Sequence, residues 1–191
     1  MEKRLIVVPL WAGTPESVWY PWLKKQLAVG SSQPFRNMMV LDMPNPDAPI
    51  IETWVTKIAE SVGPDESEIA RTVLVGHSVS CRAILKYLTT LPIGAKLMGT
   101  LHVAGWWTVD KPWDTLRSWL EMPIDIDHAR LATTKSVVLL SDNDPFTADY
   151  AANKRTWEEK LKAVVKLVPG AGHFKGEEEP SILEVLIGEF G

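Results

Sequence analysis

The sequence has few of the features that mark extracellular, membrane or nucleic-acid-binding proteins. Its single cysteine, Cys81, excludes an intramolecular disulfide and any metal site built from several cysteines. No apolar run approaches the ~20 residues of a membrane span, and Pro9 interrupts the one stretch that faintly resembles a signal peptide. Acidic residues number 24 and basic residues 20, which gives no positive excess for nucleic acid or anionic membranes. We therefore expect a cytoplasmic protein with no nucleic-acid or membrane partner.

What is present is an ordinary globular composition with one unusual feature. The 191 residues are enough for one domain, and 46% hydrophobic with 23% charged residues excludes intrinsic disorder. Tryptophan is overrepresented, with nine residues against four phenylalanines. Large rigid aromatic side chains in excess of what a core needs often line a pocket. The positions of the tryptophans therefore bear on function.

Short apolar runs alternate with helical patterns along the whole chain. Such alternation predicts an α/β fold, a doubly wound and mostly parallel sheet of about six strands with helices on both faces. We expect residues 1–191 to form a single domain of this kind. The predicted strands are 5–8, 38–41, 72–75, 97–104, 137–140 and 164–168, and helical spacing of apolar residues occupies most of the segments between and after them.

The segment at about 105–126 departs from this alternation. It contains Trp106, Trp107, Trp113 and Trp119 together with two prolines. We interpret it as a loop and a short helix that form a small lid-like insertion over the sheet.

A sharp turn follows the third predicted strand. Gly76-His77-Ser78-Val79-Ser80 is close to the G-x-S-x-G nucleophile elbow, in which a strained turn between strand and helix exposes the serine hydroxyl. Ser80 takes the place of the second glycine but is still small. The alternative is that Ser78 only caps the following helix. Because a buried strand precedes the turn and a helix follows it, we favour Ser78 as a nucleophile.

An acid and a histidine follow the last two predicted strands. Asp142 and Asp144 both lie in the loop after the fifth strand, and either could orient a histidine or merely cap the next helix. His173 follows two glycines after the sixth strand, and the glycines allow a tight turn that aims it over the sheet. The order serine, aspartate, histidine is that of α/β-hydrolases. The sequence thus predicts a catalytic triad, with its acid undecided between the two aspartates.

Together these residues resemble a known family. Val8-Pro9, Trp19-Tyr20-Pro21-Trp22-Leu23, Met43-Pro44-Asn45-Pro46, Gly76-His77-Ser78, Asp144-Pro145-Phe146 and Gly172-His173-Phe174 are similar to the small single-domain serine hydrolases of the retinoblastoma-binding protein nine and YdeN type. The resemblance covers nearly the whole chain. It implies a triad of Ser78, Asp144 and His173, and it favours Asp144 over Asp142. The first loop, Pro9-Leu10-Trp11-Ala12-Gly13, departs from the family's glycine-rich pattern and implies a bulkier pocket floor.

The expected reaction is hydrolysis of a small-molecule ester or amide through an acyl-enzyme on Ser78, with no metal and no cofactor. The backbone N–H of Val79 and one from Trp11 or Ala12 are expected to bind the oxyanion. The alternative is a non-catalytic protein-binding module on the same fold, since fold alone does not imply activity. We expect a monomer or a weak homodimer.

The tryptophans after the first and fourth predicted strands suggest the nature of the acyl group. Trp11, His77, Trp106 and Trp107 are assigned to substrate binding, because the carboxyl ends of these strands meet at one edge. Adjacent residues tend to face opposite ways, so Trp11 and Trp107 are the residues expected to face the pocket. They would select a small apolar or aromatic acyl group. The alternatives are that Trp106 and Trp107 only pack the lid against the core and that His77 only shapes the elbow.

Overall fold

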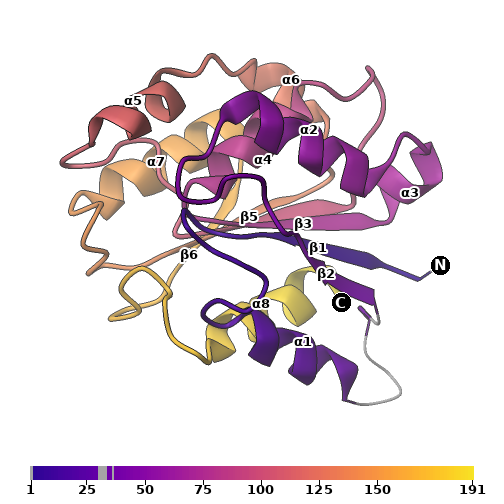
Figure 1. Ribbon diagram of the computed structural model, residues 1–191, viewed down its shortest axis with the longest axis horizontal. Coiled ribbons are helices and arrows are strands. Elements are labelled where there is room, and N and C mark those ends of the chain that lie inside the picture. Colours follow the sequence, from indigo (N-terminus) through magenta and orange to yellow (C-terminus); the bar gives the residue numbers. More distant parts are fainter. Residues whose placement is uncertain (1, 30–33, 36) are drawn as a thin grey trace.

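Six parallel strands form one sheet in the computed structural model, which describes residues 2–29, 34–35 and 37–191 (Figure 1). The order in space is β2-β1-β3-β4-β5-β6. The order reverses direction between β1 and β3, and ligands of such sheets bind beyond the carboxyl ends at this point. The strands are β1 (Arg4–Val8), β2 (Asn37–Val40), β3 (Thr72–His77), β4 (Gly99–Val103), β5 (Ser136–Leu140) and β6 (Val164–Leu167). The predicted α/β-hydrolase-like fold is confirmed.

Burial differs between the middle and the edges of the sheet. Every residue of β3, β4 and β5 is buried, because helices cover both faces of these strands. The strand predicted at 164–168, which is β6, is not buried in this way. This edge strand has exposed Val164 and Leu167 and carries Lys166, since it has a neighbouring strand on one side only.

Helices cover the sheet in two layers, with α1 and α8 on one face and α2, α4, α6 and α7 on the other (Figure 1). Alternate strand residues face the two layers: Ile6 packs in the core with Trp54 and Trp157, whereas Val7 packs in the core with Trp19. The helices are α1 (Tyr20–Ala28), α2 (Ile51–Val62), α3 (Glu66–Ala70), α4 (Ser80–Leu88), α5 (Asp114–Glu121), α6 (Ile126–Leu131), α7 (Tyr150–Leu161) and α8 (Pro180–Phe190). None of the helices in the described residues has the length and apolar character that a membrane span requires.

The short helices α3 and α6 are not among the predicted elements. With five and six residues they are too short for an amphipathic pattern to emerge. Their N-termini are capped by aspartates: Asp65 accepts hydrogen bonds from the backbone N–H groups of Ser67 and Glu68, and Asp125 accepts one from that of His128.

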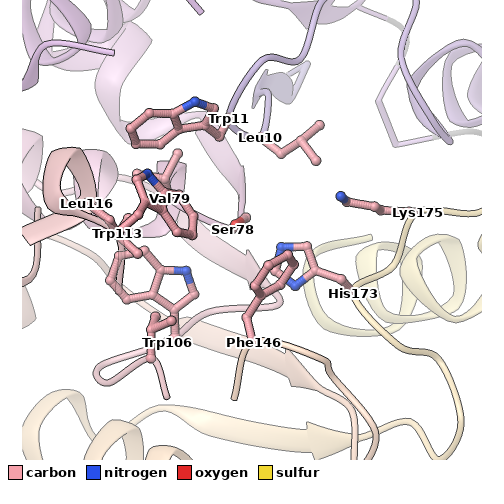
Figure 2. A pocket seen from close by; sticks show the side chains of 11 residues that line it. Leu10, Trp11, Ser78, Val79, Trp106, Trp113, Leu116, Phe146, His173 and Lys175 are labelled. Carbon is pink, nitrogen blue, oxygen red and sulfur yellow. The ribbon is translucent and has the colours of Figure 1, made fainter. Parts of the chain in front are cut away.

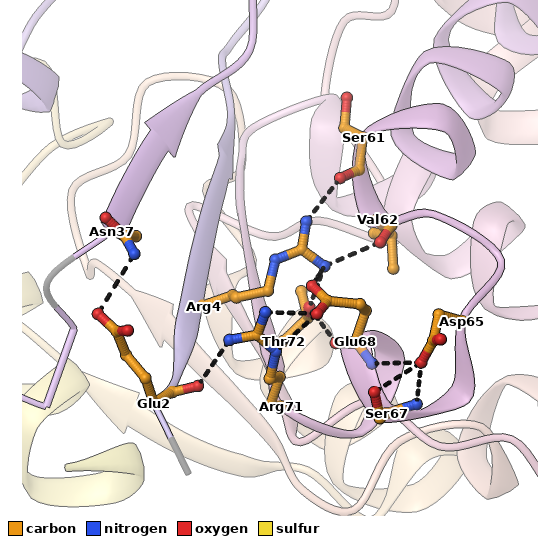
Figure 3. A network of polar contacts seen from close by, with 10 residues as sticks. All are labelled: Glu2, Arg4, Asn37, Ser61, Val62, Asp65, Ser67, Glu68, Arg71 and Thr72. Carbon is orange, nitrogen blue, oxygen red and sulfur yellow. Dashed lines mark hydrogen bonds and ion pairs between the residues drawn. The ribbon is translucent and has the colours of Figure 1, made fainter.

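A network of polar side chains lies at the amino-terminal ends of β1 and β3, away from the predicted site (Figure 3). The guanidinium of Arg4 donates to the carbonyl oxygens of Val62 at 2.8 Å and Ser61 at 2.9 Å, near the C-terminus of α2. It also pairs with Glu68 at 3.0 Å, and Glu68 pairs with Arg71. A cation beside the last carbonyls of a helix is favourable. The network therefore ties α2 and α3 to the amino-terminal ends of β1 and β3.

The segment 105–126 contains α5, which lies near the carboxyl ends of the strands (Figure 1). Arg82 of α4 donates to the carbonyl oxygens of Trp119 and Leu120, both at 3.1 Å, and so holds the last turn of α5. The buried Trp119 ring packs edge-on against Trp54 with 5.7 Å between centroids. The segment is thus anchored to α4 and α2 by polar and apolar contacts.

The start of β4 offers a test of the packing between the sheet and α8. A Cβ atom at Gly99 would overlap the ring of Phe190, so we expect Gly99→Ala to destabilise the protein by roughly 1–3 kcal/mol through overpacking. The free energy of unfolding in urea measures this effect. In a Phe190→Leu background the loss should be smaller, because the ring that the new methyl group meets is gone. An equal loss in both backgrounds would contradict this account of the contact.

Candidate active site

Ser78 occupies a strained turn between β3 and α4. Its φ of 61° lies in the left-handed region that residues other than glycine rarely adopt. Its backbone N–H donates to the carbonyl of Val103 in the neighbouring strand at 2.9 Å, which holds the turn in place. A Cβ atom at Gly76 would lie 3.0 Å from the backbone nitrogen of Cys81, so the start of the helix can approach only a glycine this closely. These features are those of a nucleophile elbow.

Ser80, which stands where the pattern has a second glycine, has a contact of its own. Its hydroxyl donates to the carbonyl of Pro9, and this hydrogen bond joins the first turn of α4 to the end of β1. The loop with Leu10 and Trp11 begins at that point. The departure from the pattern therefore supplies a link between the elbow and the first loop.

Asp144 and His173 form a buried pair beside this turn. Asp144 Oδ2 lies 2.7 Å from His173 Nδ1, and Asp144 Oδ1 accepts the backbone N–H of Phe146 at 3.0 Å. The carboxylate acceptor places a proton on Nδ1 and leaves Nε2 to face elsewhere. The exposed fractions of Asp144 and His173 are only 6% and 7%. This geometry fixes the orientation of the imidazole.

Ser78 and His173 line the same cavity of about 60 Å³. In Figure 2 the Ser78 hydroxyl and the imidazole face one another across it. The two described side chains make no direct hydrogen bond in this structure. Catalytic hydrogen bonds are often long without substrate and shorten when it binds. The arrangement is thus compatible with proton transfer between Ser78 Oγ and Nε2.

Asp142, the rival acid, contacts the backbone of the histidine loop instead of the imidazole. Its Oδ1 accepts the N–H of Gly170 at 2.8 Å, and Asn143 accepts that of Gly172 at 2.7 Å. Both glycines have positive φ, 73° and 58°, which explains why glycine stands in this loop. The loop after β5 therefore holds the loop after β6 through two side chains and contacts the imidazole through Asp144.

His77, which the sequence assigns to substrate binding, is not among the residues that line the cavity. It is fully buried: Nε2 lies 2.9 Å from the carbonyl oxygen of His173, and Nδ1 lies 2.9 Å from the hydroxyl of Tyr20. Because a carbonyl can only accept, Nε2 carries the proton and Nδ1 accepts the Tyr20 O–H. The Tyr20 oxygen in turn accepts the N–H of Leu10 at 2.9 Å. Burial lowers the pKa of His77 to about 3, so the ring is neutral.

Some backbone N–H groups near Ser78 donate a hydrogen bond within the described part of the protein, and others do not. In the first loop, Leu10 donates to Tyr20 and Ala12 donates to the carbonyl of Pro46 at 2.8 Å. Neither the Trp11 N–H nor the Val79 N–H has an acceptor among the residues that the structure describes. Of the two candidates for the second oxyanion donor, Ala12 is thus occupied and Trp11 is free.

Of the tryptophans assigned to the pocket, Trp11 and Trp106 line the cavity and Trp107 does not. Trp107 lies between two cations, with Arg82 at 5.1 Å and Lys160 at 4.6 Å from the ring centroid. Adjacent residues do face opposite ways, but the residue facing inward is Trp106. The sequence pattern has no feature that distinguishes the two.

Several residues that line the cavity are missing from the predicted set. The segment 105–126 contributes Val109, Trp113 and Leu116, and the ring of Trp113 packs edge-on against Trp11 at 5.4 Å. Phe146 and Lys175 complete the lining beside His173 (Figure 2). Phe146 and Lys175 each follow a triad candidate by two residues, a proximity in sequence that could have identified them.

Comparisons with known proteins identify relatives that match nearly the whole chain. The chain is 26% identical to YdeN of Bacillus subtilis (strain 168) over 196 residues, covering 100% of this chain and 97% of YdeN. The crystal structure of the ydeN gene product has a similar fold, with a TM-score of 0.82, 24% identity and 98% of each chain covered. RedJ, a thioesterase from the prodiginine biosynthetic pathway in Streptomyces coelicolor, is more distant, with a TM-score of 0.68, 14% identity, and 99% of this chain and 91% of RedJ covered.

The match to a family extends over nearly the whole chain. Residues 5–184 match the family described as serine hydrolase. This range includes the elbow, the acid loop and the histidine loop. The chain therefore belongs to the serine hydrolase family.

Proposed function

We propose that this protein hydrolyses carboxylic esters or amides of short acyl groups through an acyl-enzyme on Ser78. The observation that carries the proposal is the buried contact of 2.7 Å between Asp144 and His173 next to a serine held at positive φ. A binding role needs neither the strained serine nor the oriented imidazole. Acyl transfer through a covalent intermediate uses both.

The proposed reaction begins with attack of Ser78 Oγ on the substrate carbonyl while Nε2 of His173 takes the hydroxyl proton. Asp144 holds the imidazole in the tautomer with a proton on Nδ1 and stabilises its charged form. The tetrahedral intermediate collapses as His173 gives its proton to the leaving alcohol or amine. A water molecule then attacks the acyl-enzyme, with His173 again as base, and releases the carboxylic acid.

The developing oxyanion would accept hydrogen bonds from the N–H groups of Val79 and Trp11. Both lack another acceptor among the described residues, and Val79 begins the turn into α4, whose N-terminus carries a partial positive charge. Removal of one such donor typically raises the barrier by about 2.7–4 kcal/mol. The Tyr20 contact that occupies the preceding N–H, that of Leu10, supports this orientation of the loop.

The cavity favours a short apolar acyl group. Its volume is about 60 Å³, and Trp11, Trp106, Trp113 and Leu116 form much of its wall. Indole rings and a leucine side chain provide mainly apolar contact, which suits an apolar acyl chain. The sequence predicts a small apolar or aromatic acyl group, and a cavity of this volume favours a short aliphatic one.

The nucleophile can be tested directly. We expect a fluorophosphonate probe to label the protein at Ser78 and Ser78→Ala to lose labelling together with at least about a thousandfold of kcat for para-nitrophenyl acetate. Mass spectrometry of the labelled peptide identifies the site, and the unfolding midpoint checks that the variant is folded. Unlabelled wild-type protein without esterase activity would favour the alternative of a binding module.

The two aspartates provide a matched pair of variants. Asp144→Asn should lower kcat by roughly a thousandfold or more, because an amide no longer enforces the catalytic tautomer of His173. Asp142→Asn should lower it by less than about tenfold, since an amide oxygen can still accept the N–H of Gly170. Steady-state kinetics on one ester compares them. Equal losses would show that Asp144 is not the acid of the triad.

The two adjacent tryptophans give a second matched pair. Trp106→Ala should raise kcat/KM for para-nitrophenyl hexanoate relative to the acetate by roughly fivefold or more, because the indole limits the length of the cavity. Trp107→Ala should change that ratio by less than about twofold, since its ring lies against Arg82 and Lys160 instead. A change of similar size in both variants would place the acyl chain elsewhere.

A further inference from the structure

Among the residues that the structure describes, Lys175 is the one lysine or arginine that lines the cavity with Ser78 and His173. No aspartate or glutamate is part of that lining, which is otherwise apolar apart from Ser78 and His173. In Figure 2 the ammonium group of Lys175 points into the cavity, and it lies 5.7 Å from the centre of the Phe146 ring. A lysine in contact with bulk water alone would need no explanation. Lys175 is exposed to solvent, but it also lines the cavity that contains Ser78 and His173.

The charge of Lys175 is not neutralised within the described part of the chain. Lys135, Lys154 and Lys166 each form an ion pair with a glutamate, whereas Lys175 forms none. Three glutamates follow Lys175 closely in sequence, at 177–179. One of them, Glu179, turns back to accept the backbone N–H of Gly176 at 3.0 Å. The cation thus remains available to a ligand in the cavity.

The proposed mechanism determines which half of the substrate meets Lys175. His173 must give a proton to the leaving group, so the leaving group lies on the side of the cavity that His173 forms. Lys175 is two residues beyond His173 and lies on that same side in Figure 2. Trp106, Trp113 and Leu116 lie across the cavity from them, where an apolar acyl chain fits. The positive charge therefore faces the leaving group and not the acyl chain.

Resting on the hydrolase function proposed above, we infer that the substrates of this protein carry an anionic group, a carboxylate or a phosphate, on the leaving half of the molecule. Lys175 is then a specificity-determining residue that binds this group. The bond that breaks and the products released are those of ordinary ester hydrolysis, an acid and an alcohol, and the alcohol bears the anion. An ammonium group suits either anion, because it binds as a point charge without a fixed fork of donors.

Two isosteric esters test this inference. Meta-acetoxybenzoate and meta-acetoxybenzamide share the acetyl group and differ in the charge of the leaving phenol. We expect the wild-type ratio of kcat/KM, benzoate over benzamide, to fall about threefold to tenfold in Lys175→Gln and to be retained in Lys175→Arg. Intrinsic reactivity cancels when the ratio is compared between variants. A third ester, meta-acetoxyphenyl phosphate, shows whether phosphate or carboxylate has the larger dependence on Lys175.

Lys24→Gln is the matched control, since it removes the same charge from an exposed position on α1 outside the cavity. It should leave the wild-type ratio unchanged. The ratio should also fall for the wild type between about 0.01 M and about 1 M salt, as the Debye length decreases from ~30 Å to ~3 Å. If turnover depends on Ser78 but the ratio of kcat/KM, benzoate over benzamide, is the same in the wild type and in Lys175→Gln, this inference is overturned and the proposed function stands. Absence of any turnover that depends on Ser78 would overturn the proposed function and this inference with it.

Discussion

The geometry of the site depends on the two hydrogen bonds that the neutral imidazole of His77 makes. The imidazole has a donor and an acceptor on opposite sides of one ring, and both are used: Nε2–H binds the carbonyl of His173, and Nδ1 accepts from Tyr20. Tyr20 extends the chain of hydrogen bonds to the N–H of Leu10. One buried side chain thereby connects the elbow, the histidine loop and the first loop. Because burial holds the pKa of His77 near 3, protonation does not disturb this connection near neutral pH.

Several residues with positive φ follow strands at the same edge of the sheet. Ala12, Ser78, Ala104 and Phe174 all have positive φ between 50° and 61°, and each lies in a loop that follows a strand. Residues in this conformation persist only where the surrounding structure holds them. Ser78 is held by its hydrogen bond to Val103 and by the close approach of α4 to Gly76. Ser78 lines the cavity itself, and Ala12, Ala104 and Phe174 each lie one or two residues from a residue that lines it.

The sequence was sufficient for the architecture and for the pairing of His173 with an aspartate, and insufficient for the direction of individual side chains. The apolar signal is strongest for the four inner strands, because burial on two faces leaves a continuous apolar run, whereas the edge strands β2 and β6 are partly exposed. Periodicity cannot distinguish Trp106 from Trp107, since both are apolar, adjacent and outside regular structure. The position of His77 was unpredictable for a related reason: a polar residue beside Ser78 is equally compatible with the cavity surface and with a buried hydrogen-bonding role. Only the positions of Tyr20 and of the His173 carbonyl decide between these alternatives.

The two sides of the cavity are formed by different loops, and the segment between β4 and β5 forms one of them. Arg82, four residues beyond Ser78 on α4, fixes the last turn of α5 by binding its free carbonyl oxygens. The α5 side of the cavity is therefore joined by hydrogen bonds to the helix that follows Ser78. Lys175 instead lies on the loop held by Asp142 and Asn143. In the proposed reaction, acyl length and leaving-group charge would thus depend on different loops, and substitutions in one would alter selectivity without moving the contacts of the other.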